Sequence, residues 1–317
     1  RADADEVRQE PPFSPEEVQA LSVMASPCTG KPYGVERVCA AWGQPRSSYY
    51  AARVLKQKPD VRPGKRGPRT PLADEEVLAL IRSDLAASPF QGEGYRKVWA
   101  RLRFVKGLEI SGKRVLRLMR GANLLSPYRT RKGKAKAHDG KIRTDAPNVM
   151  WGTDGAKVFT VKDGWVWIFT AVEHWNAECV GHHVCKVGSR FNALEPIAMA
   201  LTNIYGSVEA GSARGLRLRM DHGQQYLSEH FQNQLKFWGI TPSFAFVEEP
   251  QTNGVAERFN RTLKEQAIYG RVFQTVEEVR EAVTAFIQRY NEQWRVEKIA
   301  FLTPREARDQ WSAREAA

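Results

Sequence analysis

The chain has 317 residues, of which 42% are hydrophobic, and it carries a formal net charge of +12. This length exceeds the usual size of one domain, so two or three domains are expected. There is no run of about 18 apolar residues and no visible signal peptide, and the four scattered cysteines are too few for a disulfide framework. We therefore expect a soluble protein of a reducing cytoplasm, without a membrane partner.

The positive charge is concentrated in one third of the chain. Residues 51–150 hold 24 Lys and Arg against 9 Asp and Glu, whereas residues 1–50 and 151–317 sum to −2 and −1. A solvated charged face is the ordinary reason for such a run. A surplus of this size in one segment nevertheless favours a polyanionic partner, above all nucleic acid.

The first ordered part, about residues 14–54, is typical of a helix, a tight turn and a second helix. In GVERVCAAWGQPRSSYYAARVL one helical pattern ends near Gly43 and another begins after Pro45. This is a candidate helix-turn-helix DNA-binding module. The residues at the start of its second helix that we expect to contact DNA are Arg46, Ser47 and Tyr49.

Residues 73–125 repeat this pattern with three short basic helices, DEEVLALIRSDLAA, GYRKVWARLRF and SGKRVLRLMRGANLL. A generic helical bundle and a second helix-turn-helix module explain the pattern equally well, and the charge and the flanking linkers favour the DNA-binding module. The expected DNA contacts are Arg96, Lys97, Lys113 and Arg114.

Two basic stretches rich in Pro and Gly are typical of linkers, and we expect them to follow the DNA backbone. The second contains the candidate contacts Arg129, Arg131 and Lys132. The predicted organisation is a DNA-binding module (1–55), a linker (56–72), a second DNA-binding module (73–125), a linker (126–148) and a C-terminal domain (149–317).

From about residue 149 the pattern changes to strands. VMWGTDGAKVFTV, WVWIFTAVEHW and ECVGHHVCK predict an antiparallel meander, with Asp163-Gly164 as the first hairpin turn. Two further strands, GLRLRMD and TPSFAF, alternate with helices, and amphipathic helices close the domain. This order predicts an α/β fold, a mixed five-stranded sheet with helices on its faces.

Three carboxylates occupy unusual positions in this domain. Asp154 lies inside the first strand among small residues, and Asp221 ends the fourth strand, where α/β sheets bind ligands. Glu257 lies on a helix, on the face opposite the apolar stripe of Val255, Phe259 and Leu263. Each has an ordinary explanation: a strand-edge charge, a helix cap and a solvated i,i+4 ion pair.

Together, however, the three carboxylates would repel by about 4 kcal/mol per pair at 4 Å and an effective dielectric of 20. A cation makes such a cluster tolerable, and oxygen ligands favour Mg²⁺ or Mn²⁺, paired for phosphodiester chemistry. Glu257 is then a metal ligand, and Arg261 and Lys264, further along the same helix, meet DNA phosphates.

Thirty-five residues separate Asp221 from Glu257. With this spacing, WGTDGAKVFT, MDHGQQYLSEHF and PQTNGVAERFNRTLKE resemble the D,D(35)E transposases of bacterial insertion sequences and the retroviral-type integrases. The resemblance covers about residues 149–310, and the upstream helices resemble the family's helix-turn-helix region. It implies an RNase H-like core in which Asp154, Asp221 and Glu257 are catalytic and bind two Mg²⁺ ions, with Mn²⁺ as a possible substitute.

The resemblance also implies an activity and partners. The protein would be a polynucleotidyl transferase that binds double-stranded DNA, exposes the 3′-OH ends of its element and joins them to target DNA without a covalent enzyme intermediate. It would act in the bacterial cytoplasm on the nucleoid, as a homo-oligomer of at least two copies, because two terminal inverted repeats must be brought together. Further expected DNA contacts in the core are Asn253, Gln224 and Arg258.

Some features depart from the family pattern. EHWN at 173–176 replaces a D-x-x-S-R-like segment and MDHGQQY replaces S-D-x-G-x-x-Y/F, so contacts with the terminal nucleotides are expected to differ. No histidine precedes His138, so we expect no N-terminal His2Cys2 zinc module. Cys179, His183 and Cys185 share strand parity, and we interpret them as structural rather than metal-binding.

Two other functions stay open. One is a DNA-binding regulator with a silent core, and the other is an RNase H-like nuclease that cuts without joining. The chain starts at Arg1, which is consistent with an upstream segment that was removed or is encoded in another reading frame.

Overall fold

The computed structural model describes residues 14–57, 71–127, 142, 144–245 and 253–316. The chain divides into two compact units, residues 1–71 and 72–317. Among the described residues, no helix combines the length and the apolarity needed to cross a membrane. The predicted linker contacts Arg129, Arg131 and Lys132 lie outside the described residues.

The first unit contains three helices, α1 (Pro15–Val23), α2 (Gly34–Ala41) and α3 (Arg46–Gln57). Ser14 caps α1 in a reciprocal capping box with Glu17. The buried side chains at its centre are Val18, Val38, Cys39 and Tyr49. The predicted helix, turn and helix are therefore confirmed in this unit.

The second unit begins with the helical region, residues 72–127. It contains α4 (Asp74–Ala87), α5 (Tyr95–Ala100), the π-helix η1 (Arg101–Val105) and α6 (Gly112–Gly121). The Arg101 guanidinium lies 2.7 Å from both Asp84 and Glu93, so one largely buried cation of η1 is joined to α4 and to the loop before α5. The three predicted helices are confirmed, although the structure places this region and the C-terminal domain in one compact unit.

A mixed five-stranded sheet forms the centre of the C-terminal domain. Its strands are β1 (Met150–Thr160), β2 (Gly164–Glu173), β3 (Cys179–Cys185), β4 (Arg217–Met220) and β5 (Thr241–Phe244). The order is β3-β2-β1-β4-β5. The first three strands pair antiparallel, and β4 and β5 continue the sheet in parallel from β1. The predicted meander and mixed sheet are confirmed.

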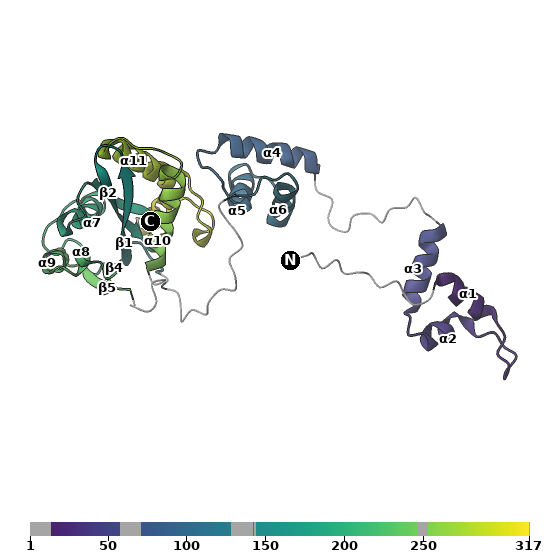
Figure 1. Ribbon diagram of the computed structural model, residues 1–317. Coiled ribbons are helices and arrows are strands. Elements are labelled where there is room, and N and C mark those ends of the chain that lie inside the picture. Colours follow the sequence, from purple (N-terminus) through teal and green to yellow (C-terminus); the bar gives the residue numbers. More distant parts are fainter. Residues whose placement is uncertain (1–13, 58–70, 128–141, 143, 246–252, 317) are drawn as a thin grey trace. The chain divides into compact units, whose positions relative to one another are not determined.

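Helices cover both faces of this sheet (Figure 1). One face packs against α7 (Arg190–Tyr205), α8 (Gln224–Leu227) and α9 (Glu229–Trp238). The other packs against α10 (Gly254–Leu263), the π-helix η3 (Lys264–Ile268) and α11 (Val276–Gln293). The chain ends with a 3-10 turn, η4 (Glu297–Ile299), and α12 (Pro304–Glu315).

Two glycines allow these helices to approach the sheet closely. A Cβ on Gly181 of β3 would lie 1.8 Å from the backbone oxygen of Pro196 in α7. A Cβ on Gly152 of β1 would lie 3.3 Å from Ala256 of α10 and 3.0 Å from the ring of His174. The small residues beside Asp154 therefore allow α10 to pack against the strand that carries it.

Candidate active site

Asp154 lies on the central strand, on the face of the sheet that packs against α10. Strand side chains alternate between faces, and Trp151 belongs to the α7 side whereas Ala156 and Val158 belong to the α10 side. Asp154 shares the parity of Ala156, and its Oδ2 accepts a hydrogen bond of 3.0 Å from Asn260 Nδ2 on α10. Its Oδ1 accepts one of 2.8 Å from the Gly155 amide.

Asp221 follows β4 directly, and β4 is the parallel neighbour of β1. Its Oδ1 accepts a hydrogen bond of 2.9 Å from the Gly223 amide, a local turn that orients the carboxylate. Gly223, not Asp221, is the N-cap residue of α8. The predicted position of Asp221 at the carboxyl end of its strand is therefore confirmed, and the helix-cap explanation is not.

Glu257 projects from the first turn of α10. Phe259 and Leu263 on the opposite stripe are buried, with Val255 packed against the same core, whereas Glu257 and Arg261 are exposed, as the helical wheel predicts. Lys264 is only partly exposed, because α10 ends at Leu263 and the wider turns of η3 begin at Lys264.

The three carboxylates are near enough for charge repulsion to contribute to raised pKa values at two of them, Asp154 and Glu257. Burial raises the pKa of Asp154, and the charge of Asp221 raises it further, although the hydrogen bond from Asn260 acts in the opposite direction. Partial burial raises the pKa of Glu257, as do the charges of Asp154 and Asp221. The fold thus brings together, across β1, β4 and α10, three acidic groups that repel one another.

The donor chemistry of these groups suits a hard divalent cation. All three supply carboxylate oxygens, which Mg²⁺ and Mn²⁺ prefer, and a cation would remove the repulsion that raises the pKa values of Asp154 and Glu257. Within the described segments, no three His, Cys, Asp or Glu side chains are already clustered closely enough to hold a metal ion. Closing the site on a cation would therefore require these side chains to move closer together.

Each cysteine of β3 forms a hydrogen bond to a nearby backbone carbonyl. Cys179 is buried, its Sγ donates to the Gly181 carbonyl at 3.4 Å, and burial raises the pKa of its thiol. Cys185 Sγ donates to the Val187 carbonyl at 3.2 Å.

Asn260 and Thr170 are site residues that the sequence analysis did not identify. Thr170, the β2 partner of Asp154 in the sheet, donates from Oγ1 to Asn260 Oδ1 at 3.0 Å. Asn260 in turn donates to Asp154, and it lies one turn after Glu257 on α10. This buried chain of hydrogen bonds fixes the Asp154 carboxylate relative to the helix that carries Glu257. The signal in the sequence was a polar residue three positions after Glu257, beside the apolar stripe.

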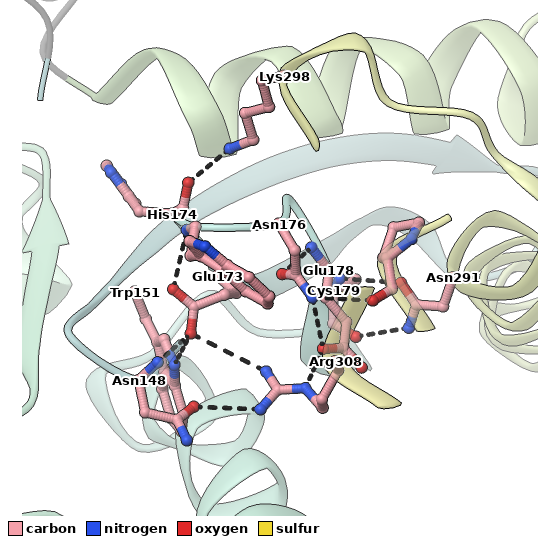
Figure 2. Close-up of polar contacts among 12 residues, drawn as sticks. Asn148, Trp151, Glu173, His174, Asn176, Glu178, Cys179, Asn291, Lys298 and Arg308 are labelled. Atoms are coloured by element: carbon pink, nitrogen blue, oxygen red, sulfur yellow. Dashed lines mark hydrogen bonds and ion pairs between the residues drawn. The ribbon is translucent and has the colours of Figure 1, made fainter. Parts of the chain in front are cut away.

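EHWN at 173–176 forms part of a buried polar network at the end of β2 (Figure 2). Glu173 is fully buried, and its Oε2 accepts hydrogen bonds from the Asn148 amide at 2.6 Å and from Trp151 Nε1 at 3.1 Å. Arg308 of α12 forms ion pairs with Glu173 and with Glu178. Burial raises the pKa of Glu173 despite these partners. The network joins α12 to the ends of β1 and β2.

The neighbouring side chains of this segment are also buried. Asn176 Nδ2 donates to the Pro304 carbonyl at 2.9 Å, and His174 is 5% exposed. Burial lowers the pKa of His174 to about 4, so its ring is neutral at neutral pH. Glu173, His174 and Asn176 are therefore buried within the protein. Their burial does not fit a direct contact with terminal nucleotides.

The predicted DNA-contacting residues differ in accessibility. Tyr49 is 3% exposed and its hydroxyl donates to Gln19 Oε1, while Asn253 is 1% exposed and its Nδ2 donates to the Thr153 carbonyl at 3.1 Å. Burial contradicts direct DNA contact by these two side chains. The exposed candidates are Arg46, Ser47, Arg96, Lys113, Gln224, Arg258 and Arg261.

Three basic candidates have partners within the second unit. Arg114 is largely buried and bonds to Asp74 and to the Leu72 carbonyl, which holds α6 on α4. Arg96 forms an ion pair with Glu297, and Lys97 contacts Trp294. These three side chains thus interact with other groups of the protein.

Comparisons with known proteins agree with this architecture. An integrase core domain model matches residues 238–304, and an HTH-like domain model matches residues 74–132. The chain is 27% identical over 231 residues to the putative transposase InsK for insertion sequence element IS150 of Escherichia coli (strain K12), covering 68% of this chain and 77% of that protein.

Two further similarities were found. Transposase InsD for insertion element IS2A/D/F/H/I/K of Escherichia coli is 26% identical over 221 residues, covering 68% of this chain and 71% of InsD. The catalytic core domain of BIV integrase is 22% identical, with a TM-score of 0.38, covering 54% of this chain and 99% of that one. With an HTH-like domain match before its mixed five-stranded sheet and an integrase core domain match within the C-terminal domain, the chain is similar to transposases of bacterial insertion sequences.

Proposed function

We propose that this protein is an insertion-sequence transposase that binds the ends of its element and catalyses DNA cleavage and strand transfer through Asp154, Asp221 and Glu257. The observation that supports this proposal most directly is that burial and the neighbouring carboxylates raise the pKa values of Asp154 and Glu257, which lie on elements distant in sequence. Perturbed titratable groups gathered in this way are a feature of functional sites.

In the proposed reaction, water attacks the phosphodiester at the element end, the P–O bond to the element's 3′ oxygen breaks, and a 3′-OH is released. That 3′-OH then attacks a target phosphodiester, forming a new P–O bond as an old one breaks. Two Mg²⁺ ions, or Mn²⁺ in their place, would activate the attacking oxygen and stabilise the leaving oxygen. Asp154, Asp221 and Glu257 would hold them.

The protein's other residues would position the DNA. Arg258 and Arg261 are exposed on α10 beside Glu257, and Lys264, whose charge lowers the pKa of Asp154, lies at the start of η3. These cations suit phosphate contacts next to the carboxylates. Gln224 is exposed three residues after Asp221, where it suits a contact to the terminal nucleotides.

The DNA substrate implies an assembly. Two inverted repeats must be held together before transfer, so we propose a homo-oligomer of at least two copies on double-stranded DNA. Sedimentation of the protein with and without duplex end DNA tests this directly: a protein–DNA complex with a single copy that nevertheless joins two ends would contradict it.

The decisive experiment uses labelled duplex containing the sequence that flanks the gene, with Mg²⁺ or EDTA, and scores nicked and joined products. We expect metal-dependent joining by the wild type and none by Asp154→Ala, Asp221→Ala or Glu257→Ala, all with near-normal DNA binding. Glu229→Gln, an exposed carboxylate on the first turn of α9, is the matched control.

The other outcomes separate the alternatives. Nicking without joining would indicate a nuclease. Binding without either reaction would indicate a DNA-binding regulator, and loss of binding in all three alanine variants would refute the separation of binding from catalysis.

A further inference from the structure

Residues 294–301 of the C-terminal domain contact the helical region directly. The Lys97 ammonium lies 3.1 Å from the centre of the Trp294 ring, and the ring of Phe90 meets the same indole edge-on at 4.9 Å. Lys97 also donates to the Arg295 carbonyl at 2.8 Å. The Lys97 ammonium therefore makes both a cation–π contact and a hydrogen bond to the C-terminal domain, which together form a specific interaction.

Two polar contacts flank this centre. Arg96 forms an ion pair of 2.8 Å with Glu297, which is exposed and contributes little by itself. The Gln91 amide donates to Gln266 Oε1 at 2.9 Å, and Gln266 Nε2 donates back to the Gln91 carbonyl at 2.8 Å. This reciprocal pair fixes the backbone before α5 against η3, which continues the helix that carries Glu257.

The far end of the segment is an unusual turn. Ala300 and Phe301 both have positive φ, at 55° and 64°, which is rare for consecutive residues other than glycine. The turn presents the Phe301 ring edge-on to Trp99 at 5.2 Å and stacks it on Phe104 at 6.0 Å. Trp99 is held from its own side by a 2.8 Å hydrogen bond from Nε1 to the Ile110 carbonyl.

The segment is also anchored to the sheet and to the helix that carries Glu257. Lys298 donates to the His174 carbonyl at the end of β2 (Figure 2). The Trp294 ring stacks on Tyr290 at 5.7 Å, and Tyr290 meets Phe259 of α10 edge-on at 4.9 Å. A continuous series of rings therefore runs from Phe90 of the helical region to a residue two positions after Glu257.

We propose that residues 294–301 are a docking segment that holds the helical region in a fixed position relative to α10. The inference rests on the proposed function: the distance from the recognised sequence to the cleaved phosphodiester would be set inside one chain. Arg96 and Lys97 would then serve this contact, and the exposed Lys113 and Arg120 on α6 would remain for DNA.

The docking itself can be tested without DNA. In the full-length Arg96→Lys variant, a carbodiimide should couple the new amine to the Glu297 carboxylate within one chain, giving a linked peptide by mass spectrometry. The double variant Arg96→Lys, Glu297→Gln lacks the acceptor and is the control. Absence of this linked peptide in a folded protein would overturn the docking.

The consequence for cleavage is read at single-nucleotide resolution on end-labelled duplex with Mg²⁺. We expect one cut position for the wild type, and cuts spread over neighbouring bonds for Trp294→Ala and Phe301→Ala, with total cleavage within about twofold. Trp311→Ala is the matched control, because the Trp311 ring packs against Trp175 of the C-terminal domain at 5.3 Å. If Trp294→Ala does not fold, Phe301→Ala on its surface turn gives the same readout.

The results distinguish the two proposals. Unchanged single cut positions in both variants would overturn the role of the segment in setting the cut. If the Arg96→Lys variant forms the linked peptide and the wild-type protein does not cut, the proposed function would be overturned and the docking would be supported.

Discussion

Arg308 is the most informative residue for testing the energetics of this fold. Its guanidinium forms ion pairs with Glu178 and Glu173 and lies 3.4 Å from Asn148 Oδ1. The arginine side chain is 18% exposed, and the two carboxylates are 9% and 0% exposed. Arg308→Met preserves the volume of the aliphatic stem and removes the charge, leaving two acidic groups without their cation.

The expected loss follows from the burial. Removing one partner of a buried ion pair costs about 3–5 kcal/mol, because the remaining charge is uncompensated. The remaining carboxylate can lose its charge by binding a proton. For a carboxyl group with an ordinary pKa near 4.3, protonation costs about 4 kcal/mol at pH 7 and about 1 kcal/mol at pH 5. We therefore expect Arg308→Met to lose about 3–4 kcal/mol at pH 7, and about 1 kcal/mol at pH 5.

Urea unfolding followed by tryptophan fluorescence at both pH values measures this difference. At roughly 2–4 °C per kcal/mol for a unit of this size, the Tm at pH 7 should fall by about 6–16 °C. The double variant Arg308→Met, Glu178→Gln removes one of the two stranded charges, so it should recover much of the loss. A deficit below about 0.5 kcal/mol, or one that does not change with pH, would refute the reasoning.

Three further predictions concern the site and the packing. Asn260→Leu removes the hydrogen-bond donor to Asp154 and leaves the Thr170 hydroxyl without its acceptor. DNA cleavage should therefore fall about 10–100-fold, while DNA binding in a gel-shift assay stays within about twofold. Equal losses of cleavage and binding would contradict a positioning role for Asn260. Because the pKa values of Asp154 and Glu257 are raised by folding, their contribution to stability is full below the ordinary carboxyl range and is lost as pH rises through the raised values. Denaturant unfolding in EDTA should therefore show a smaller loss from pH 4 to pH 7 for Glu257→Gln than for the wild type, and Mg²⁺ should stabilise only the wild type strongly; identical pH dependence would be the contrary result. Gly181→Ala should destabilise by about 1–3 kcal/mol because its Cβ meets the Pro196 carbonyl oxygen, whereas Gly121→Ala, with no atom within 4 Å of the added Cβ, should stay within about 0.5 kcal/mol.

The elements of the fold and the positions of the carboxylates could be predicted because they depend on local patterns. Strand-like apolar segments and the Asp163-Gly164 turn identified all five strands, and the stripe of Val255, Phe259 and Leu263 oriented α10 correctly. Asp154 and Asp221 followed from strand parity and from the order of the strands. These predictions use only the periodicity of apolar residues along the sequence and the rule that ligands bind at the carboxyl ends of parallel strands.

What could not be predicted depends on pairs of residues far apart in the sequence. Thr170 and Asn260 are 90 residues apart, and Arg96 and Glu297 are 201 apart. A basic residue on a short helix has the same local pattern whether it meets DNA or a carboxylate of its own chain. For this reason Arg96, Lys97 and Arg114 were indistinguishable from Lys113. Tyr49 and Asn253 differ from the exposed candidates because each is buried and its side chain donates a hydrogen bond inside the protein, which the local sequence pattern does not reveal.

The two apolar layers of the catalytic domain give its two sides unequal tolerance to change. Asp154, Glu257, Asn260 and the docking segment lie on or against the layer formed by α10 and α11, whereas α7 and α9 pack on the opposite face. A comprehensive substitution map should therefore show loss of activity without unfolding mainly on the side of α10 and α11. On the side of α7 and α9, substitutions should reduce activity only when they also reduce folding. A fluorophore attached at the exposed Lys236 of α9 should then report DNA binding while leaving cleavage unchanged.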